Sequence, residues 1–225
     1  MGYQIAVDGP SGAGKSSLAK ALAQEFSFLY VDTGALYRAI GLYCLRKGID
    51  TKQSQQVIAQ LDEIQVELRR IDGVQHVYLN GEDVSEQIRT PAGAAAASDV
   101  SAVAEVRQFL LDLQRSVAKT HNVIMDGRDI GTVVLPDADV KLFLTAAPEV
   151  RARRRYEELL QKGKADSCSY DEILALIKQR DLQDSTRAIA PLKCAEDAQV
   201  LDNSEIDFDQ TVQQAVKMIR SKIDV

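Results

Sequence analysis

Nine residues near the amino terminus constrain the fold of this chain more than any other feature of its sequence. Residues 9–17 read GPSGAGKSS, which matches the pattern G-x-x-x-x-G-K-[ST]. Glycines let consecutive backbone N–H groups turn inward around phosphate oxygens, and the start of a helix adds partial positive charge. The apolar run at residues 3–7 precedes the motif and a helical pattern follows it, which is the context that a phosphate-binding P-loop requires.

The motif predicts which residues hold the phosphates of ATP. These are Gly9, Pro10, Ser11, Gly12, Ala13, Gly14, Lys15, Ser16 and Ser17. Lys15 is placed to reach the β- and γ-phosphates, and Ser16 to offer its hydroxyl to Mg²⁺. A GTPase-type switch module is the rival class, but it needs an Asn-Lys-x-Asp guanine motif that this sequence lacks. A translocating ATPase would need a larger chain and an apolar run that ends in Asp-Glu.

Short apolar runs alternate with helical patterns along the rest of the chain. We expect strands at residues 3–7, 28–31, 122–125, 140–145 and 200–201. We expect helices at residues 15–26, 36–47, 53–61, 103–117 and 207–223. Strands that alternate with helices predict an α/β fold built on a parallel sheet.

Residues 64–84 break this alternation. The hairpin dipeptides Asp72-Gly73 and Asn80-Gly81 separate runs of alternating polarity, which predicts a small antiparallel meander. A meander does not belong to a parallel core. We therefore expect it to be part of an inserted subdomain at about residues 62–98.

Charge and cysteine content limit the possible partners. The chain has 33 acidic and 27 basic residues and a net charge of −6, which argues against a nucleic-acid or anionic-membrane partner. No apolar run is long enough to span a bilayer. The chain has three cysteines, an odd number without a metal-binding spacing, which favours a reducing compartment. They are Cys44, Cys168 and Cys194. We expect a cytoplasmic monomer that binds anionic substrates through local clusters of basic residues.

Four arginine-containing stretches are candidates for binding a phosphorylated acceptor, because a guanidinium pairs with phosphate oxygens at two points. Residues 32–38 and 126–131 each follow an expected strand, at the sheet edge where open α/β folds bind ligands. Residues 151–155 and 180–187 carry the other arginines. Asp126, at the end of its strand, is well placed to order a water bound to Mg²⁺.

Taken together, GPSGAGKSS, DTGALYR, DGRDIGTVVLPDA, ARRR and RDLQDSTRAIAPL resemble the bacterial-type cytidylate kinases over most of the chain. The hairpin insertion is a hallmark of that family. The resemblance implies one P-loop kinase domain, residues 1–225, with a three-layer core around a five-stranded parallel sheet. It also implies an acceptor-binding subdomain at about residues 35–107 and a helical lid at about 148–170.

The resemblance further implies transfer of the γ-phosphate of ATP to CMP or dCMP, with Mg²⁺, and it assigns residue roles. The acceptor phosphate is assigned to Arg38, Arg128 and Arg187. The base is assigned to Ser98, Arg107 and Asp129, with Thr33 nearby. The sugar hydroxyls are assigned to Arg180 and Asp184. The lid arginines that close on the transferring phosphate are Arg151, Arg154 and Arg155. For the Mg²⁺ hydroxyl the family favours Ser17, whereas the general motif favours Ser16.

The implied roles agree with the chemistry of the side chains. A carboxylate such as Asp129 accepts a hydrogen bond from the cytosine amino group, and Arg107 can donate to the acceptor edge of the base. Uracil carries a carbonyl in place of the amino group, so we expect CMP to be preferred by roughly 1–3 kcal/mol. The hairpin and RDLQDSTR argue against the alternative, a P-loop kinase acting on UMP, AMP or shikimate.

Overall fold

The computed structural model describes residues 2–71, 73–161, 163 and 169–225. The chain divides into two compact units. The P-loop unit comprises Tyr3–Leu29 and Asn122–Val225, and the hairpin unit comprises Tyr30–His121 together with Gly2. Asp72 of the expected hairpin turn, Cys168, and residues 162 and 164–168 of the expected lid lie outside the described residues.

A five-stranded parallel sheet in the order β2-β6-β1-β7-β8 confirms the expected core. Its strands are β1 (Gln4–Asp8), β2 (Leu29–Asp32), β6 (Val123–Asp126), β7 (Val140–Thr145) and β8 (Gln199–Asp202). β1 lies parallel to both β6 and β7, with Val7 opposite Asp126 on one side and Leu142 on the other. Ile5, Val7 and Ile124 are fully buried, as expected of strands in a parallel sheet that is covered on both faces.

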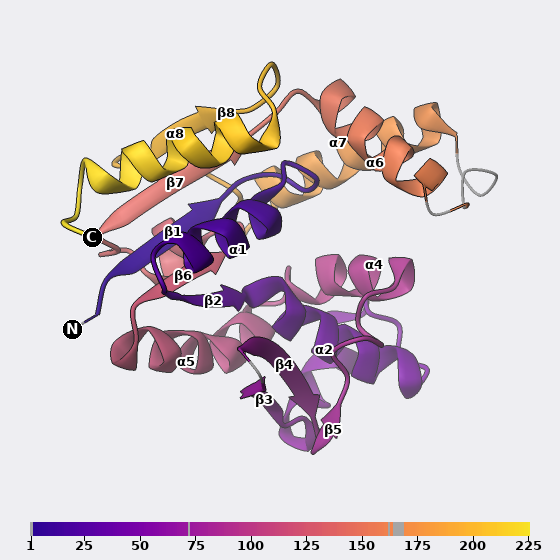
Figure 1. Cartoon of the computed structure of the whole chain (residues 1–225). Coiled ribbons are helices and arrows are strands. Elements are labelled where there is room, and N and C mark those ends of the chain that lie inside the picture. Colours follow the sequence, from indigo (N-terminus) through magenta and orange to yellow (C-terminus); the bar gives the residue numbers. More distant parts are fainter. Residues whose placement is uncertain (1, 72, 162, 164–168) are drawn as a thin grey trace. The chain divides into compact units, whose positions relative to one another are not determined.

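Two pairs of helices belong to the P-loop unit. They are α1 (Lys15–Glu25) with α8 (Phe208–Arg220), and α6 (Pro148–Gln161) with α7 (Tyr170–Thr186). Helices α1 and α8 pack on each other and on the sheet, whereas α6 and α7 pack on each other (Figure 1). No apolar periodicity in the sequence predicts α7, although Ser169 and Glu172 form a capping box at its start.

A short π-helical turn, η2 (Ile130–Val134), follows β6 and contacts β1. Turns of this kind are rare and are frequent at functional sites.

The predicted meander forms in the hairpin unit. Its antiparallel strands are β3 (Val66–Ile71), β4 (Val74–Leu79) and β5 (Glu82–Asp83). Asn80 and Gly81 join β4 to β5 with φ angles of 49° and 84°, the positive values that a two-residue Asn-Gly hairpin requires. The dipeptide therefore identified this turn correctly from sequence alone.

Helices build the core of the hairpin unit. They are α2 (Thr33–Arg46), α3 (Ser54–Ile58), the 3₁₀ turn η1 (Leu61–Glu63), α4 (Pro91–Val100) and α5 (Ala104–Thr120). The expected helix at 53–61 is thus interrupted between α3 and η1. Helices α2 and α4 approach so closely that a Cβ at Gly41 would lie 2.8 Å from the Ala96 Cβ. Leu36, Ile40 and Leu110 are fully buried in this core.

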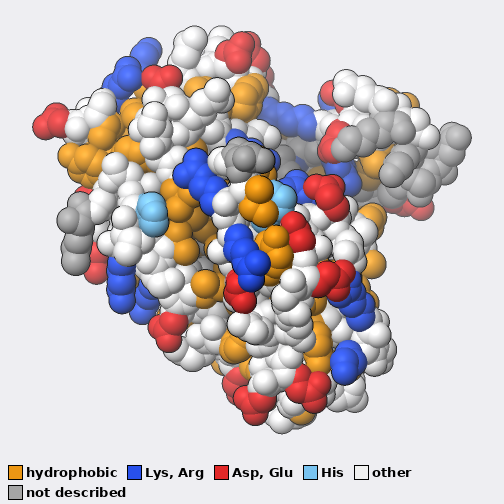
Figure 2. Space-filling model, turned by 60° about the horizontal axis from the view of Figure 1, so that its bottom comes forward, with side chains coloured by type: hydrophobic (Ala, Val, Ile, Leu, Met, Phe, Trp, Pro, Cys, Tyr) orange, Lys and Arg blue, Asp and Glu red, His pale blue; other side chains and the backbone are white. Residues whose placement is uncertain are grey.

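Among the described residues, none of the helices combines the length and the apolar character that a membrane crossing demands. Figure 2 shows acidic and basic side chains interspersed over the face that it draws. Anion binding therefore has to be sought in individual side-chain clusters.

Candidate functional site

The backbone of the P-loop takes a conformation that depends on glycine. Gly9 has a φ of 144°, and a Cβ there would lie 1.9 Å from the carbonyl oxygen of Leu144. Gly14, with a φ of 94°, directly precedes α1. The loop therefore presents its N–H groups at the start of a helix, the arrangement that binds phosphate.

Lys15 is buried within this loop. Its Nζ donates a hydrogen bond to the carbonyl oxygen of Pro10 at 2.7 Å. Burial is the main reason that the pKa of Lys15 lies well below its usual value, and the nearby Arg128 lowers it further. Bound phosphates would act in the opposite direction, because an anion stabilises the ammonium form.

Ser16 and Asp126 provide a pair of oxygen ligands beside the loop. The Ser16 hydroxyl donates to Oδ2 of Asp126 at 2.7 Å, and Asp126 ends the strand next to β1. Hydroxyl and carboxylate oxygens are the ligand types that Mg²⁺ prefers, directly or through water, so these residues fit the ion. This hydrogen bond favours Ser16 over Ser17 as the hydroxyl ligand. No group of three or more His, Cys, Asp or Glu residues in the described ranges has the geometry of a metal site.

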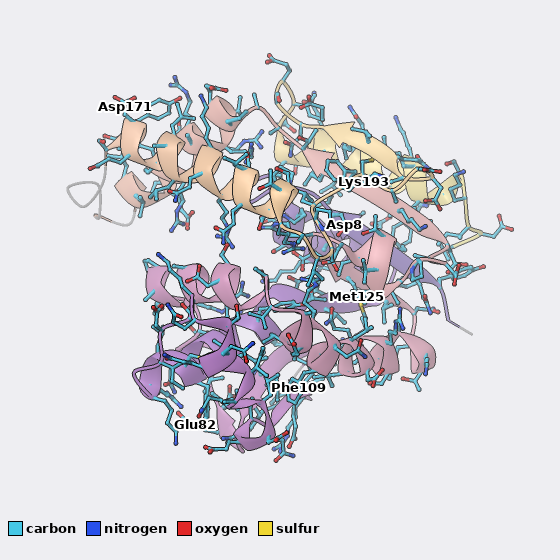
Figure 3. The ribbon with its side chains drawn as sticks, turned by 180° about the vertical axis from the view of Figure 1, so that it is seen from behind. Asp8, Glu82, Phe109, Met125, Asp171 and Lys193 are labelled. Atoms are coloured by element: carbon cyan, nitrogen blue, oxygen red, sulfur yellow. The ribbon has the colours of Figure 1, made fainter. Side chains whose placement is uncertain are left out.

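Asp8, the last residue of β1, is a buried carboxylate that the sequence analysis missed. Its oxygens accept hydrogen bonds from the backbone N–H groups of Ile130 at 2.8 Å and Gly131 at 2.7 Å. Burial raises the pKa of Asp8 to about 6, although the two N–H groups oppose the shift. Figure 3 labels Asp8 together with Met125 of the neighbouring strand β6. Its position directly before the P-loop motif is the sequence feature that could have identified it.

The end of β6 and the end of α7 bring four predicted acceptor-binding residues together. Arg128 donates from Nε to Oδ2 of Asp184 at 2.8 Å. Arg187 places Nη2 at 3.6 Å from Oδ1 of Asp129 and donates from Nε to a backbone carbonyl at 2.7 Å. The two guanidinium groups are therefore each held by a carboxylate. Arg180 lies one helical turn before Asp184 on α7.

Two arginines of α6 contact the P-loop through polar groups. Arg151 is buried, donates to the carbonyl oxygen of Ser11 at 2.9 Å, and forms a two-point ion pair with Asp181 at 2.6 and 3.0 Å. Arg154 donates to Oδ1 of Asn203 at 3.0 Å, and Asn203 donates to the carbonyl oxygen of Ala13 at 3.1 Å. Both arginines thus link α6 to the loop.

The third predicted lid arginine lies elsewhere on α6. Arg155 forms an exposed ion pair with Glu158 at 2.6 Å, three residues further along the same helix. The linking residue Asn203 was missed by the sequence analysis. It follows β8 at the same sheet edge as the other strand-end residues, which is the signal that could have found it.

In the hairpin unit, Arg38 is anchored at the start of α2. Asp32 caps this helix by accepting from the backbone N–H of Ala35 at 3.0 Å, and its other oxygen accepts from Arg38 Nη2 at 2.6 Å. The Gln75 side chain of β4 exchanges two hydrogen bonds with the backbone of Asp32, at 3.0 and 3.2 Å. Gln75 was also missed, because no local pattern connects residues 43 positions apart.

The other predicted base-binding residues also lie in the hairpin unit. Thr33 is the buried first residue of α2. Ser98, on α4, has a buried hydroxyl oxygen without a hydrogen-bond partner among the described residues. Arg107, on α5, donates to the carbonyl oxygen of Ser101 at 3.1 Å and lies 5.5 Å from the ring centroid of Tyr37. An unsatisfied buried hydroxyl such as that of Ser98 is consistent with a ligand partner.

The predicted site residues therefore fall into two groups. Thr33, Arg38, Ser98 and Arg107 belong to the hairpin unit, and the remaining predicted residues belong to the P-loop unit. Within each unit, hydrogen bonds and ion pairs hold members of the group in place. The convergence of Arg38 with Arg128 and Arg187 on one phosphate stays a prediction, as do the acceptor-binding and lid roles of the expected subdomains.

Comparison with known proteins gives a consistent result along the chain. The family model for cytidylate kinase matches residues 5–221. The cytidylate kinase of Caldicellulosiruptor saccharolyticus is 47% identical over 214 residues, which cover 95% of this chain and 94% of that protein. The cytidylate kinase of Caldanaerobacter subterraneus subsp. tengcongensis is 48% identical over 217 residues, which cover 96% and 94%.

A solved structure supports the fold alone. An uncharacterised protein from Eubacterium ventriosum superposes with a TM-score of 0.55 at 12% identity, covering 97% of this chain and 99% of that chain.

Proposed function

The chain belongs to the cytidylate kinase family, and we propose on this premise that it transfers the γ-phosphate of ATP to CMP or dCMP. The products are ADP and CDP or dCDP. The observation that carries the proposal is the cluster of Arg128, Asp129, Asp184 and Arg187 in the same unit as a complete P-loop. A P-loop alone predicts a nucleotide site, whereas these additional arginines suit an acceptor that is itself phosphorylated.

On the donor side, the P-loop N–H groups and Lys15 hold the ATP phosphates. Ser16 and Asp126 are the residues that fit Mg²⁺, with Ser17 as the family-based alternative. Mg²⁺ held by these residues would neutralise negative charge on the phosphate that is transferred. Bound phosphates would favour the ammonium form of Lys15 and so oppose the effect of burial, which lowers its pKa.

On the acceptor side, Arg128 and Arg187 bind the phosphate of CMP, together with Arg38 of the hairpin unit. The carboxylates that hold these guanidinium groups before substrate arrives reduce the entropy lost when the phosphate binds. Asp129 accepts from the cytosine amino group, and Ser98, Arg107 and Thr33 complete the base site. Arg180 and Asp184 hold the sugar hydroxyls.

The lid role falls to α6. Arg151 and Arg154 stabilise charge on the transferring phosphate, and Arg155 joins them only if α6 moves relative to the P-loop. Closure excludes water and so limits hydrolysis of ATP. The acceptor phosphate is already anionic near neutral pH, so the reaction requires positioning and charge neutralisation but no covalent intermediate.

A coupled assay of ADP formation tests the proposal. The purified chain is supplied with ATP and Mg²⁺ and with CMP, dCMP, UMP, AMP or shikimate in parallel. We expect rapid turnover with CMP and dCMP, weaker turnover with UMP, and none above ATP hydrolysis with shikimate. Turnover confined to AMP or shikimate would assign the chain to another small-molecule kinase. ATP binding without acceptor-dependent turnover would favour a switch module.

Three further expectations accompany this function. Chelation of Mg²⁺ by EDTA should abolish turnover and excess Mg²⁺ should restore it.

We also propose a monomer located in the cytoplasm. Size-exclusion chromatography with light scattering should give one mass near that of a single chain, and a stable dimer would contradict this expectation.

A further inference from the structure

The buried carboxylate of Asp8 has no role in the reaction as described so far, although it lies beside the P-loop. It is the last residue of β1 and immediately precedes Gly9. Only 5% of Asp8 is exposed, so the protein carries a desolvated acidic group at this point. A buried ionisable group is costly unless something satisfies it, and here both oxygens have partners.

Those partners are the first two N–H groups of the π-helical turn η2. Oδ1 accepts from Ile130 at 2.8 Å and Oδ2 accepts from Gly131 at 2.7 Å, from positions more than 120 residues away in the chain. The opening N–H groups of a helical turn lack partners within the turn. Asp8, at the end of β1, therefore caps η2. Its carboxylate accepts a charge-assisted hydrogen bond from each of these two N–H groups.

The capped turn fixes the residue that precedes it. Asp129 precedes η2 as its N-cap residue, and its carbonyl oxygen accepts hydrogen bonds from the N–H groups of Val133 at 2.9 Å and Val134 at 3.2 Å. Asp129 is itself buried, and its carboxylate lies 3.6 Å from Arg187. Any displacement of η2 consequently moves the group that we assign to the cytosine amino group.

Gly131 shows how closely the turn fits against Asp8. A Cβ added at Gly131 would lie 3.0 Å from Cδ of Lys141 and 3.4 Å from Oδ2 of Asp8. The turn is thus enclosed between the Asp8 carboxylate and the Lys141 stem. A methyl group at this position would crowd the Lys141 stem, so the stem or the turn would have to shift by a few tenths of an ångström.

We propose that Asp8 is a positioning residue for acceptor selection, which holds Asp129 in register with the P-loop by capping the turn Ile130–Val134. The inference rests on the proposed function of Asp129 in reading the base. Asp8 touches neither substrate in this role, because it acts through backbone hydrogen bonds. The end of the ATP-binding strand and the acceptor-reading segment are thereby fixed to one another within a single unit.

The variant Asp8→Asn tests this positioning role, because asparagine keeps the shape but can accept at only one of the two N–H groups. We expect the KM for CMP to rise by about tenfold and the CMP-over-UMP preference to fall, with a much smaller change in the KM for ATP. Gly131→Ala should give a smaller change of the same pattern, because the added methyl group crowds the turn that Asp8 caps against the Lys141 stem. Equal losses for ATP and CMP in both variants would overturn the proposal.

Asp139→Asn is the matched control. Asp139 also accepts a backbone hydrogen bond across the sheet, from the Gln4 N–H at 2.7 Å, but it lies outside the predicted site. This variant should leave both KM values unchanged. A comparable rise in the KM for CMP would show that any lost strand contact has this effect, and would overturn the specific role of Asp8.

A double-mutant cycle separates positioning from general damage. Asp129→Ala removes the group that Asp8 is proposed to orient, so adding Asp8→Asn to that variant should not lower the CMP-over-UMP preference further. A further loss of the same size as in the wild-type background would contradict action through Asp129.

Amide hydrogen exchange tests the structural part without any substrate. In Asp8→Asn, protection of the N–H groups over residues 130–134 should fall by about tenfold or more, while protection in β7 is retained. Unchanged protection of the turn would overturn the proposal even if the kinase assay succeeds. If the wild-type chain fails to phosphorylate CMP but protection is lost as expected, then the proposed function fails and the capping role stands.

Discussion

Asp8 of the P-loop unit and Glu82 of the hairpin unit, both labelled in Figure 3, are acidic side chains whose pKa values shift in opposite directions. Burial raises the pKa of Asp8 to about 6. Hydrogen bonds from Arg46 and Gln87 lower the pKa of the exposed Glu82 to about 2. Burial disfavours the charged form of Asp8, whereas hydrogen-bond donors at the surface favour the charged form of Glu82.

The same difference extends to the two units as a whole. Among the described residues, the buried charged side chains of the P-loop unit are Asp8, Lys15, Asp126, Asp129, Lys141, Arg151 and Asp184. In the described part of the hairpin unit, Arg107 is a buried charged side chain, whereas the ion pairs Arg46–Glu82 and Arg69–Glu67 are more exposed. Buried charges are costly and tend to mark functional sites, so we expect substitutions in the P-loop unit to have the larger effects.

The largest effect is expected at Arg128. Arg128→Ala removes a proposed phosphate-binding guanidinium and leaves Asp184 without its partner, so kcat/KM for CMP should fall by about 100-fold or more. Affinity for ATP, measured by equilibrium binding, should change little. Arg69→Ala is the control, because Arg69 pairs with Glu67 on the exposed sheet of the hairpin unit. Equal losses in the two variants would remove the contrast between the units.

A second effect concerns pH and Asp8. The folded protein holds the Asp8 proton more tightly than the unfolded chain, since its pKa rises from 3.8 to about 6. The stability gained from protonation is fully present below pH 3.8 and is lost as the pH rises through 6. The nearby Asp129 raises this pKa and Lys15 lowers it.

Urea denaturation of the wild type and Asp8→Asn at several pH values measures this loss. The free energy of unfolding of the wild type, relative to the variant, should fall by up to about 3 kcal/mol between pH 4 and pH 7. A constant difference across this range would show that Asp8 titrates normally and that its burial has little electrostatic cost.

A smaller effect is expected at Gln75, which links the hairpin to the start of α2. Gln75→Ala removes two hydrogen bonds to the Asp32 backbone, so the KM for CMP should rise by about fivefold. The control is Gln65→Ala, because the Gln65 side chain donates to Oε1 of Glu67 at 3.0 Å on the exposed surface of the hairpin unit. An unchanged KM in Gln75→Ala would show that the cap of α2 holds Arg38 without help from the hairpin.

The smallest effect is expected at Glu82. Glu82→Gln removes an exposed ion pair with Arg46, and such pairs contribute little because water and salt screen them. Thermal unfolding and the KM for CMP should both match the wild type within error. A clear loss of stability would mean that surface pairing in the hairpin unit matters as much as burial in the P-loop unit.

The amino-acid sequence was sufficient to predict the features that depend on neighbouring residues. The P-loop motif, the alternation of strands and helices, and the Asn80-Gly81 turn are each encoded within a few positions. The parallel sheet and the antiparallel meander confirm these predictions. Helix α7 was missed although its capping box is local, because its polar residues lack a clear apolar face.

The contacts of Asp8, Gln75 and Asn203 were decided only by the tertiary structure. Asp8 accepts a hydrogen bond from the Ile130 N–H, 122 positions away in the chain. Gln75 accepts one from the Asp32 N–H, 43 positions away. Asn203 donates one to the carbonyl oxygen of Ala13, 190 positions away. A polar side chain that satisfies a backbone group far along the chain leaves no periodic trace in the sequence. Its partner is set by which loops the packed sheet and helices bring together, and by the cost of leaving a buried polar group unpaired.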